Sequence, residues 1–166
     1  MAFEGHDMKV IADDMVGLAN FPLLWRWTQE THAKFARDEL ASIRPVRPAK
    51  AATVCAQFLS CGIKMSAVTD RVDANGETAG DVVKSWLEER LPGGEKDVLL
   101  IWDRDTAAVV PRRLFVHRWD DFWYPSSDDL LVTGTIGTWW IEMRHDGLFE
   151  FSAGGAVEQP DAMDSR

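Results

Sequence analysis

Apolar and polar positions follow a helical period in the first part of the chain. The spacing predicts one amphipathic helix over residues 22–40, opened by Asn20-Phe21-Pro22. Its buried face would carry Leu24, Trp25, Thr28, His32, Phe35 and Ala36. The opposite, charged face would carry Arg26, Trp27, Glu30, Lys34 and Arg37. A shorter helix is expected upstream, over residues 11–19.

Two more helices are predicted downstream. Pro48 opens the first, which runs to about Ser60 and buries Ala51, Val54, Cys55, Phe58 and Leu59. The second is expected to begin near Thr78, which with Asp81 resembles an N-terminal cap, and to end near Arg90. Its apolar face consists of Val82, Val83, Trp86 and Leu87. Residues 63–72, between the two helices, are ambiguous and fit a strand.

The pattern changes to that of strands beyond the third helix. The continuous apolar run over residues 98–102 is typical of a central strand, and 107–110 would return beside it. A short helix is expected over 111–119, then strands over 130–133, 138–144 and 148–151. Helices first and strands later predict an α+β fold, with N-terminal helices packed on a mainly antiparallel C-terminal sheet. Residues 1–166 are expected to form a single domain, with loose termini over 1–9 and 152–166.

The last two strands predict a hairpin with a defined register. A three-residue loop, His145-Asp146-Gly147, would set Met143 opposite Phe149 and Ile141 opposite Phe151. This register keeps the apolar side chains on one face, whereas a two-residue loop would set Met143 opposite Glu150. Gly147 would then adopt a left-handed conformation.

Eight tryptophans are a large number for 166 residues, and most of them must lie in the core. We expect Trp27 and Trp140 to be the most exposed, since each shares a face with charged residues. Trp140 alternates in phase with Glu142 and Arg144. The alternative is that a second layer of structure covers one of them.

Charge narrows the classes of partner. The formal net charge is −9 and the isoelectric point about 4.8, with no cluster of Lys and Arg. Such a surface repels nucleic acid and anionic membranes, so neither is expected as a partner. A basic protein, a cation or a neutral small molecule fits better.

Cysteine usage and the first residues indicate a cytoplasmic protein. Cys55 and Cys61 lie too far apart along one predicted helix for easy disulfide geometry, so both are expected to be reduced and buried. Residues 1–5 lack a positive start followed by an apolar run, and no apolar stretch approaches the length of a membrane span.

Motifs for common catalytic chemistries are lacking, and we expect no cofactor and no structural metal. Four histidines, His6, His32, His117 and His145, are scattered along the chain and form no ligand set, and Glu142-x-x-His145 has no identifiable third ligand. Asp103-x-Asp105 could chelate a divalent cation at a strand end. The simpler interpretation of these two aspartates is a hairpin turn.

Residues 117–129 are the most unusual segment, because aromatic rings are interleaved with carboxylates. We interpret the exposed part as a surface for a partner, built with Trp140 from Trp119, Asp120, Asp121, Trp123, Tyr124, Asp128 and Asp129. The structural alternative is an aromatic plug under the sheet with solvated acids, some of them capping helices. Ser126 or Ser127 as a nucleophile beside His117 or His145 is a further hypothesis.

Two strings carry a resemblance to known proteins: Leu100-Ile101-Trp102-Asp103-Arg104-Asp105-Thr106 and the segment from Trp119 to Asp129. They resemble small uncharacterised bacterial proteins, some of which are similar to immunity proteins of polymorphic toxin systems. The layout of the chain also resembles the SMI1/KNR4-like superfamily, in which helices pack on one antiparallel sheet. This resemblance implies protein binding and carries no catalytic residues.

Three functions therefore remain open. The first is a non-enzymatic acidic binding protein, as in an immunity protein that binds a basic partner. The second is a metal-dependent or hydrolytic enzyme that uses some of Asp103, Asp105, Asp120, Asp121, Asp128 and Asp129. The third is a structural homo-oligomer with exposed tryptophans such as Trp140 at its subunit contacts.

Overall fold

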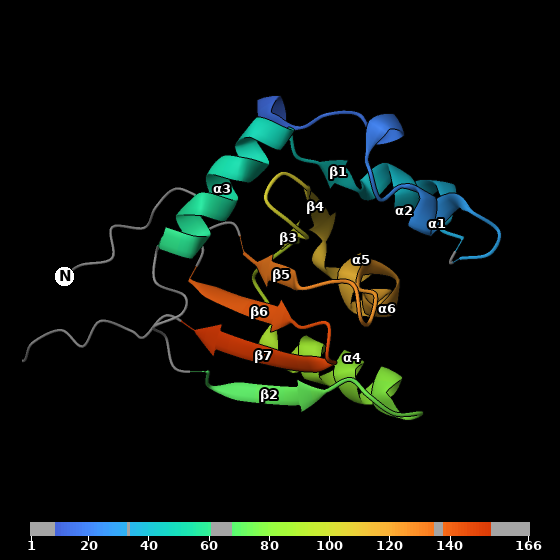
Figure 1. The fold of residues 1–166 in the computed structure, drawn as a ribbon, viewed down its shortest axis with the longest axis vertical. Coiled ribbons are helices and arrows are strands. Elements are labelled where there is room, and N and C mark those ends of the chain that lie inside the picture. Colours follow the sequence, from blue (N-terminus) through green and yellow to red (C-terminus); the bar gives the residue numbers. More distant parts are fainter. Residues whose placement is uncertain (1–8, 33, 61–67, 135–137, 154–166) are drawn as a thin grey trace, which may run out of the picture.

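One antiparallel sheet forms the centre of the molecule (Figure 1). The computed structural model describes residues 9–32, 34–60, 68–134 and 138–153. Within them, seven strands pair in the order β1-β4-β3-β5-β6-β7-β2. Their bounds are β1 Arg44–Pro45, β2 Asp70–Asp73, β3 Asp97–Ile101, β4 Ala107–Pro111, β5 Leu130–Thr133, β6 Trp139–Met143 and β7 Leu148–Ala153.

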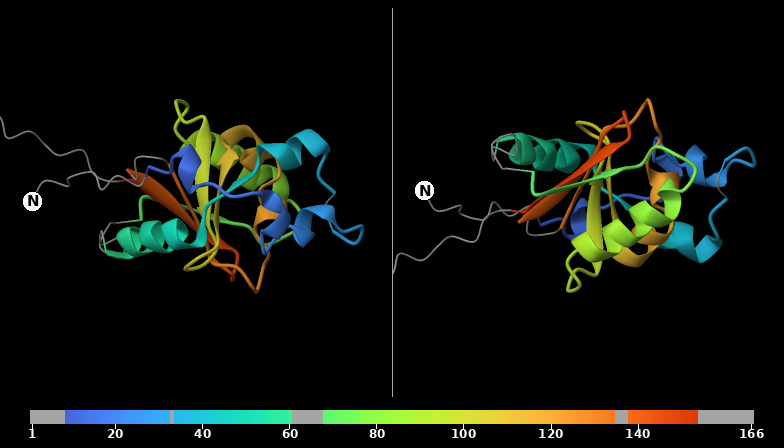
Figure 2. Two further views of the ribbon diagram at one scale, coloured as in Figure 1. Left: turned by 90° about the horizontal axis from the view of Figure 1, so that it is seen from above. Right: turned by 90° about the horizontal axis from the view of Figure 1, so that it is seen from below.

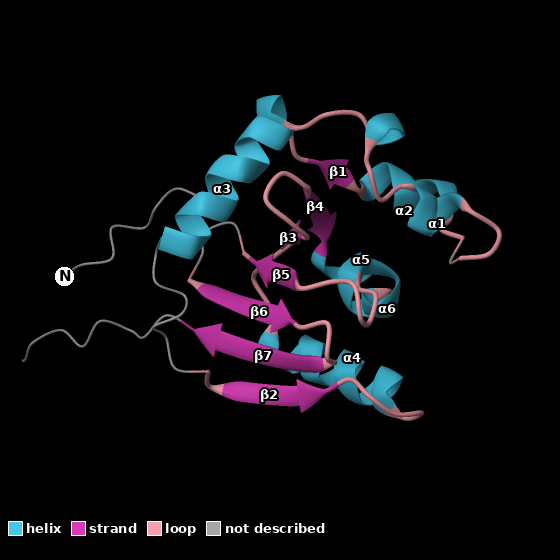
Figure 3. Cartoon of the chain, viewed as in Figure 1, coloured by secondary structure: helices cyan, strands magenta, loops and turns pink. Residues whose placement is uncertain are grey.

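Helices lie on both faces of the sheet (Figure 2). The helix α3 (Pro48–Ser60) covers one face, and α4 (Ala79–Arg90) and α5 (Arg112–His117) cover the other. Three short helices adjoin this second layer: α6 (Trp119–Phe122) lies beside α5, and α1 (Trp25–Thr28) and α2 (Arg37–Ser42) lie beside β1 (Figure 3). None of the described helices is long and apolar enough to cross a membrane.

Alternation along the strands sends apolar side chains to both faces, and this explains the continuous apolar run of β3. Val98 and Leu100 join the larger core under α4 and α5, whereas Leu99 and Ile101 join the smaller core under α3. A strand covered on both faces needs apolar residues at every position. The α+β fold with a mainly antiparallel sheet is thus confirmed.

The C-terminal hairpin has the predicted register. Met143 pairs with Phe149 and Ile141 with Phe151. Gly147 donates its backbone N–H to the Arg144 carbonyl at 2.9 Å, and its φ is +86°. The loop therefore holds three residues, as the separation of apolar and polar faces required.

Most elements downstream of residue 47 are also confirmed, with ends shifted by a few residues. The helix α3 has the predicted bounds, and α4 begins at Ala79, although the Thr78 side chain makes no cap hydrogen bond. The predicted helix over 111–119 is divided into α5 and α6. Of the ambiguous segment 63–72, residues 70–72 belong to β2, residues 68 and 69 are not strand, and residues 63–67 lie outside the described residues.

The prediction of one long helix over residues 22–40 is wrong. The helix α1 ends at Thr28, because Gln29 is extended with ψ 143°, and the chain then turns back. Phe35 donates its N–H to the Trp27 carbonyl at 3.0 Å, and the two rings stack with centroids 5.8 Å apart. A continuous helix would hold these rings more than two turns apart, so core packing outweighs local periodicity. The helix predicted over 11–19 is two 3₁₀ turns, Ala12–Asp14 and Leu18–Asn20.

The expected exposure of Trp27 and Trp140 is wrong as well. Trp27 is 0% exposed, since it packs against the rings of Phe21, Phe35 and Phe122. Trp140 is 8% exposed, because Phe58 of α3 covers it edge-on at 5.8 Å. The most exposed tryptophan among the described residues is Trp25, at 38%.

Two expectations fall partly outside the described residues. Residues 1–8 and 154–166 are not described, but Ser152 and Ala153 belong to β7 rather than to a loose tail. Cys55 is a free, half-buried thiol beside the smaller core, and burial raises its pKa. Cys61 lies outside the described residues.

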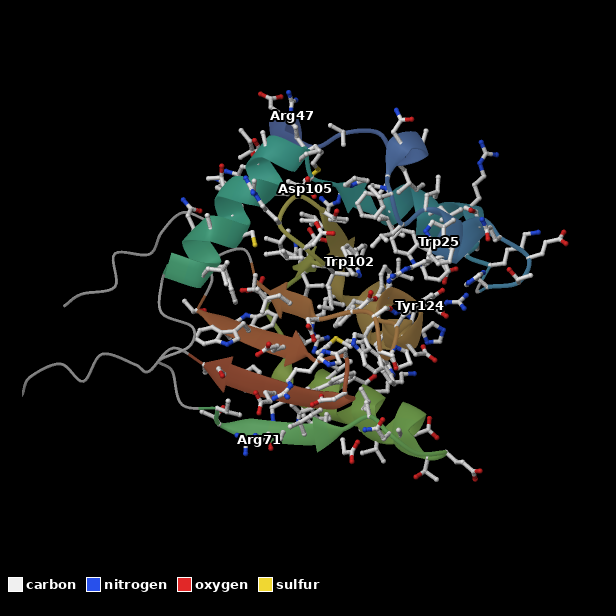
Figure 4. The ribbon with its side chains drawn as sticks, in the orientation of Figure 1. Trp25, Arg47, Arg71, Trp102, Asp105 and Tyr124 are labelled. Carbon is white, nitrogen blue, oxygen red and sulfur yellow. The ribbon has the colours of Figure 1, made fainter. Side chains whose placement is uncertain are left out.

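On the face of the sheet that α3 covers, no other described helix lies over β6, β7 and β2 (Figure 1). Glu142 of β6 stands directly opposite Glu150 of β7 there. Arg71 of β2, labelled in Figure 4, pairs with Glu150 at 2.9 Å, and Glu142 has no ion pair with a described residue. Partial burial and the charge of Glu150 raise the pKa of Glu142.

We expect Glu142→Gln to stabilise the protein at neutral pH. A carboxyl whose pKa is raised by folding favours the folded state only while it is protonated, so its charged form is a small penalty above that pKa. Removing the penalty should raise the melting temperature by about 1–2 °C at pH 7. Thermal melts at about pH 4, where glutamates protonate, should show no gain. Glu30→Gln, at an exposed site without this pairing, is the control. An equal gain at both pH values would contradict the prediction.

Candidate functional site

A buried ion pair joins the N-terminal layer to the segment after α6. Arg26 of α1 and Asp128 are 6% and 8% exposed, and they form a bidentate contact in which Arg26 Nη2 donates to Asp128 Oδ1 at 3.0 Å. The Nε of Arg26 is buried without a hydrogen-bond partner among the described residues. Removing two charges from water roughly cancels their attraction, so such a pair fixes geometry more than it adds stability.

Asp128 also holds its own loop together. Its Oδ2 accepts the backbone N–H of Tyr124 at 2.9 Å, and its backbone carbonyl accepts the indole N–H of Trp123 at 3.1 Å. The hydroxyl of Ser127 donates to Oδ1 at 3.3 Å. Asp128 was predicted to face a partner, and its burial shows instead that it organises residues 123–128 from inside.

Three rings gather on the outer side of this ion pair, where α1 meets the segment after α6. Figure 4 shows Trp25 and Tyr124 beside each other. The rings of His32 and Tyr124 are parallel within 8°, with centroids 6.1 Å apart. Trp25 stands edge-on to both, at 4.9 Å from His32 and 6.1 Å from Tyr124. The guanidinium of Arg26 lies 4.2 Å from the Tyr124 ring centroid, so the cluster rests on a buried cation.

Asp121 of α6 lies close enough to the rings to act on the Tyr124 hydroxyl, and Asp120 precedes it in the same helix. Asp120 is exposed, and Asp121 is half-buried with its Oδ2 3.6 Å from Arg118 Nη1. Burial first, and then the neighbouring charge of Asp120, raise the pKa of Asp121. Burial and the charge of Asp121 raise the pKa of the Tyr124 hydroxyl, although Arg26 opposes the shift. We call Trp25, His32, Tyr124, Asp120 and Asp121 the Trp25 surface.

The predicted partner residues thus separate into two groups. Asp120, Asp121 and Tyr124 belong to the Trp25 surface, and Asp129 is exposed nearby in sequence. Trp119 and Trp123 are buried; they stack on each other and both contact Phe149 of β7. With Trp140 under α3, these three tryptophans are core residues, as the structural alternative for this segment proposed.

Ser126, Asp129 and His145 meet at the β6–β7 turn. His145 Nδ1 lies 2.8 Å from Asp129 Oδ1, and the same oxygen accepts the His145 backbone N–H at 2.9 Å. That backbone bond is the main reason why the pKa of Asp129 is lowered. Ser126 has φ +68° and donates its backbone N–H to the His145 carbonyl, but no hydrogen bond joins its hydroxyl to the imidazole in the described structure. The contacts tie residues 124–129 to the turn.

The described residues contain no group of three His, Cys, Asp or Glu side chains that could hold a metal ion. Asp103 and Asp105 occupy the β3–β4 turn, labelled at Asp105 in Figure 4. Asp105 donates its N–H to Asp103 Oδ1 at 3.1 Å. This hydrogen bond is typical of an aspartate that stabilises a turn, the simpler of the two interpretations above.

Trp25, His32 and Arg26 were not identified as site residues from the sequence. Their place on the expected long helix put Trp25 and His32 on its buried face, and that helix does not exist. A usable signal was the run Trp25-Arg26-Trp27, because a buried Arg between two indoles needs a carboxylate partner. The sequence does not show which of 27 acidic residues that partner is.

Comparison of the chain with protein-family models, with curated proteins and with solved structures gave no match. A functional conclusion therefore rests on the geometry of the molecule itself.

Proposed function

We propose that this protein is a non-enzymatic binding protein that recognises a basic protein partner through the Trp25 surface. The supporting observation is the position of Trp25. Its side chain is 38% exposed, yet its ring is held edge-on against His32 and Tyr124 above the buried Arg26–Asp128 pair. A large apolar ring that is both exposed and fixed in place loses little conformational freedom on binding.

Composition of the surface favours a cationic partner. Tryptophan, tyrosine and arginine are the residues that most often dominate binding energy at interfaces. Lysine and arginine side chains bind favourably to aromatic rings and to carboxylates. Asp121 acts on the Tyr124 hydroxyl, and the exposed Asp120 is its neighbour in α6. The overall charge of −9 adds long-range attraction for a basic protein and speeds the encounter.

Residues 100–106 and 119–129 resemble small uncharacterised bacterial proteins, some of which are similar to immunity proteins of polymorphic toxin systems, and this resemblance fits the proposal. An acidic immunity protein neutralises a basic nuclease toxin by charge complementarity. In that role the Trp25 surface would supply an apolar anchor and the carboxylates of α6 would set orientation.

Affinity capture from an extract of the source organism, followed by calorimetry with the recovered protein, tests the proposal. We expect wild-type protein to retain a basic partner, Trp25→Ala to lose at least tenfold in affinity, and Asp120→Asn with Asp121→Asn to weaken binding in a salt-dependent way. Asp103→Asn with Asp105→Asn changes the charge equally in the exposed β3–β4 turn and should leave binding unchanged.

Three results would contradict the proposal. The recovered partner could be acidic, the two aspartate double variants could bind equally, or Trp25→Ala could bind like wild type.

Sedimentation of the purified protein tests the homo-oligomer alternative. If the protein is a dimer and Trp25→Ala dissociates it, the partner bound at the Trp25 surface is a second copy of this chain. Thermal melts should show that each variant retains its fold.

A further inference from the structure

A cleft of about 730 Å³ lies between α2, α4 and α5, apart from the Trp25 surface. Its volume is within the range of sites for small molecules. Several of its lining side chains are basic: Lys84 from α4, and Arg112, Arg113 and His117 from α5. These basic side chains lie together in a chain whose net charge is −9.

Two of the cationic side chains of the cleft have no ion-pair partner among the described residues. Lys84 and Arg113 form no ion pair or hydrogen bond with a described residue, whereas Arg26, Arg44, Arg71, Arg90, Arg118 and Arg144 each contact a carboxylate. Arg112 Nη2 donates to the backbone carbonyls of Glu88 and Leu91 at 3.1 and 3.0 Å, so it closes the end of α4. Arg112 has no carboxylate partner among the described residues, and its Nε is buried without a hydrogen-bond partner.

Acidic side chains line the same cleft. Asp38 of α2 and Glu88 of α4 face it, and neither carboxylate forms an ion pair with a described residue. Glu39, the third acid of the lining, is already occupied: it pairs with Arg118 and accepts the Ala36 backbone N–H, which lowers its pKa. Unpaired charges of both signs therefore face one small volume. A simple anion would meet attraction from Lys84 and Arg113 but repulsion from Asp38 and Glu88.

We propose that this cleft binds a small zwitterion. Its phosphate or carboxylate group would lie against Lys84 and Arg113, and its ammonium group against Asp38 and Glu88. Such a ligand satisfies both sets of charges at once. Charge-assisted hydrogen bonds of this kind are stronger than neutral ones, and a partly enclosed cleft screens them less than open water does.

Titrations monitored by amide chemical shifts in two-dimensional NMR spectra test the inference. The probes are O-phosphoserine and glutamate, which carry an ammonium with a phosphate or a carboxylate, and inorganic phosphate, which carries no ammonium. We expect saturable shifts in α4 and α5 with at least one zwitterion, at a dissociation constant of about 1 mM or below. Which of the two binds more tightly decides between a phosphate and a carboxylate ligand. Inorganic phosphate should bind at least tenfold more weakly.

Matched variants assign the binding to the cleft. Lys84→Gln with Arg113→Gln should weaken binding at least tenfold. Lys50→Gln with Arg104→Gln, which removes the same charge at α3 and at the β3–β4 turn, should not. Asp38→Asn with Glu88→Gln should remove the preference for zwitterions over inorganic phosphate. These are surface substitutions with small effects on folding, and thermal melts check that the fold is retained. Absence of saturable binding for both zwitterions up to about 10 mM, or equal losses in the two cation double variants, would overturn the proposal.

Discussion

Replacing Asp128 with alanine should lower the free energy of unfolding by about 3–5 kcal/mol. The change would leave the guanidinium of Arg26, which is 6% exposed, as an uncompensated buried charge. It would also remove the acceptor for the Tyr124 backbone N–H. Since domains of this size have a total stability of about 5–15 kcal/mol, the loss should be evident as a lower midpoint in urea unfolding.

A double substitution separates loss of the ion pair from exposure of the remaining charge. Arg26→Met with Asp128→Leu removes both charges, so it should cost clearly less than Asp128→Ala alone. The pair would not have the structural role assigned to it if Asp128→Ala cost less than about 1 kcal/mol. The same conclusion would follow if the double variant were less stable than both single variants.

Trp27→Ala should cost about 3–5 kcal/mol, as expected for a large ring removed from a packed core. Trp27 is 0% exposed and contacts four other rings, those of Phe21, Phe35, Trp102 and Phe122. Its indole N–H also donates to the Asp121 carbonyl at 3.0 Å, near the end of α6. The substitution would leave both a cavity and an acceptor without its donor.

Trp25→Ala is the matched control, because the same residue type is removed two positions away. Trp25 lies at the surface, so its loss should cost no more than about 1 kcal/mol. Urea unfolding of both variants gives the comparison directly. Equal losses would mean that the buried and exposed positions of the two tryptophans are wrongly assigned.

Strand pairing at the C-terminus was predictable because one face of the hairpin is apolar and the other is not. A shift by one residue would place Met143 opposite Glu150, and the free energy of burial rules this out locally. The apolar run of β3 was predictable for a related reason, since every position of a strand covered on both faces must be apolar. Short-range periodicity therefore contained enough information for these elements.

The N-terminal region was not predictable in the same way. Its conformation depends on where Trp27 and Phe35 fit among rings from β3–β4 and α6, and these partners are distant in sequence. The sequence does have helical periodicity over residues 22–40, but in a continuous helix Trp27 would lie on the charged face, in water. Burial of a large aromatic ring stabilises more than the few helical hydrogen bonds that are lost.

The candidate site was only partly predictable because its parts are far apart in the chain. Asp120, Asp121 and Tyr124 were identified from a local cluster. Asp128 belongs to the same cluster but forms a buried ion pair with Arg26, 102 positions away. Local composition shows where carboxylates are concentrated but not which of them has a buried cation nearby. Trp25 and His32 come to Tyr124 only after α1 and its loop have packed on α6.

The order of strands in the sheet also bears on how the chain folds. Both edge strands pair with partners far along the sequence: Arg44 with Val109, and Asp70 with Phe151. The entropy of closing these long loops is lost before the strands form stabilising contacts. Folding is therefore expected in the slow regime of milliseconds to seconds. During synthesis, β2 has no partner until β7 has left the ribosome. The segment that becomes the sheet edge therefore lacks its partner while residues 74–147 and β7 are made, and its charged residues, Asp70, Arg71 and Asp73, protect it from pairing with other chains.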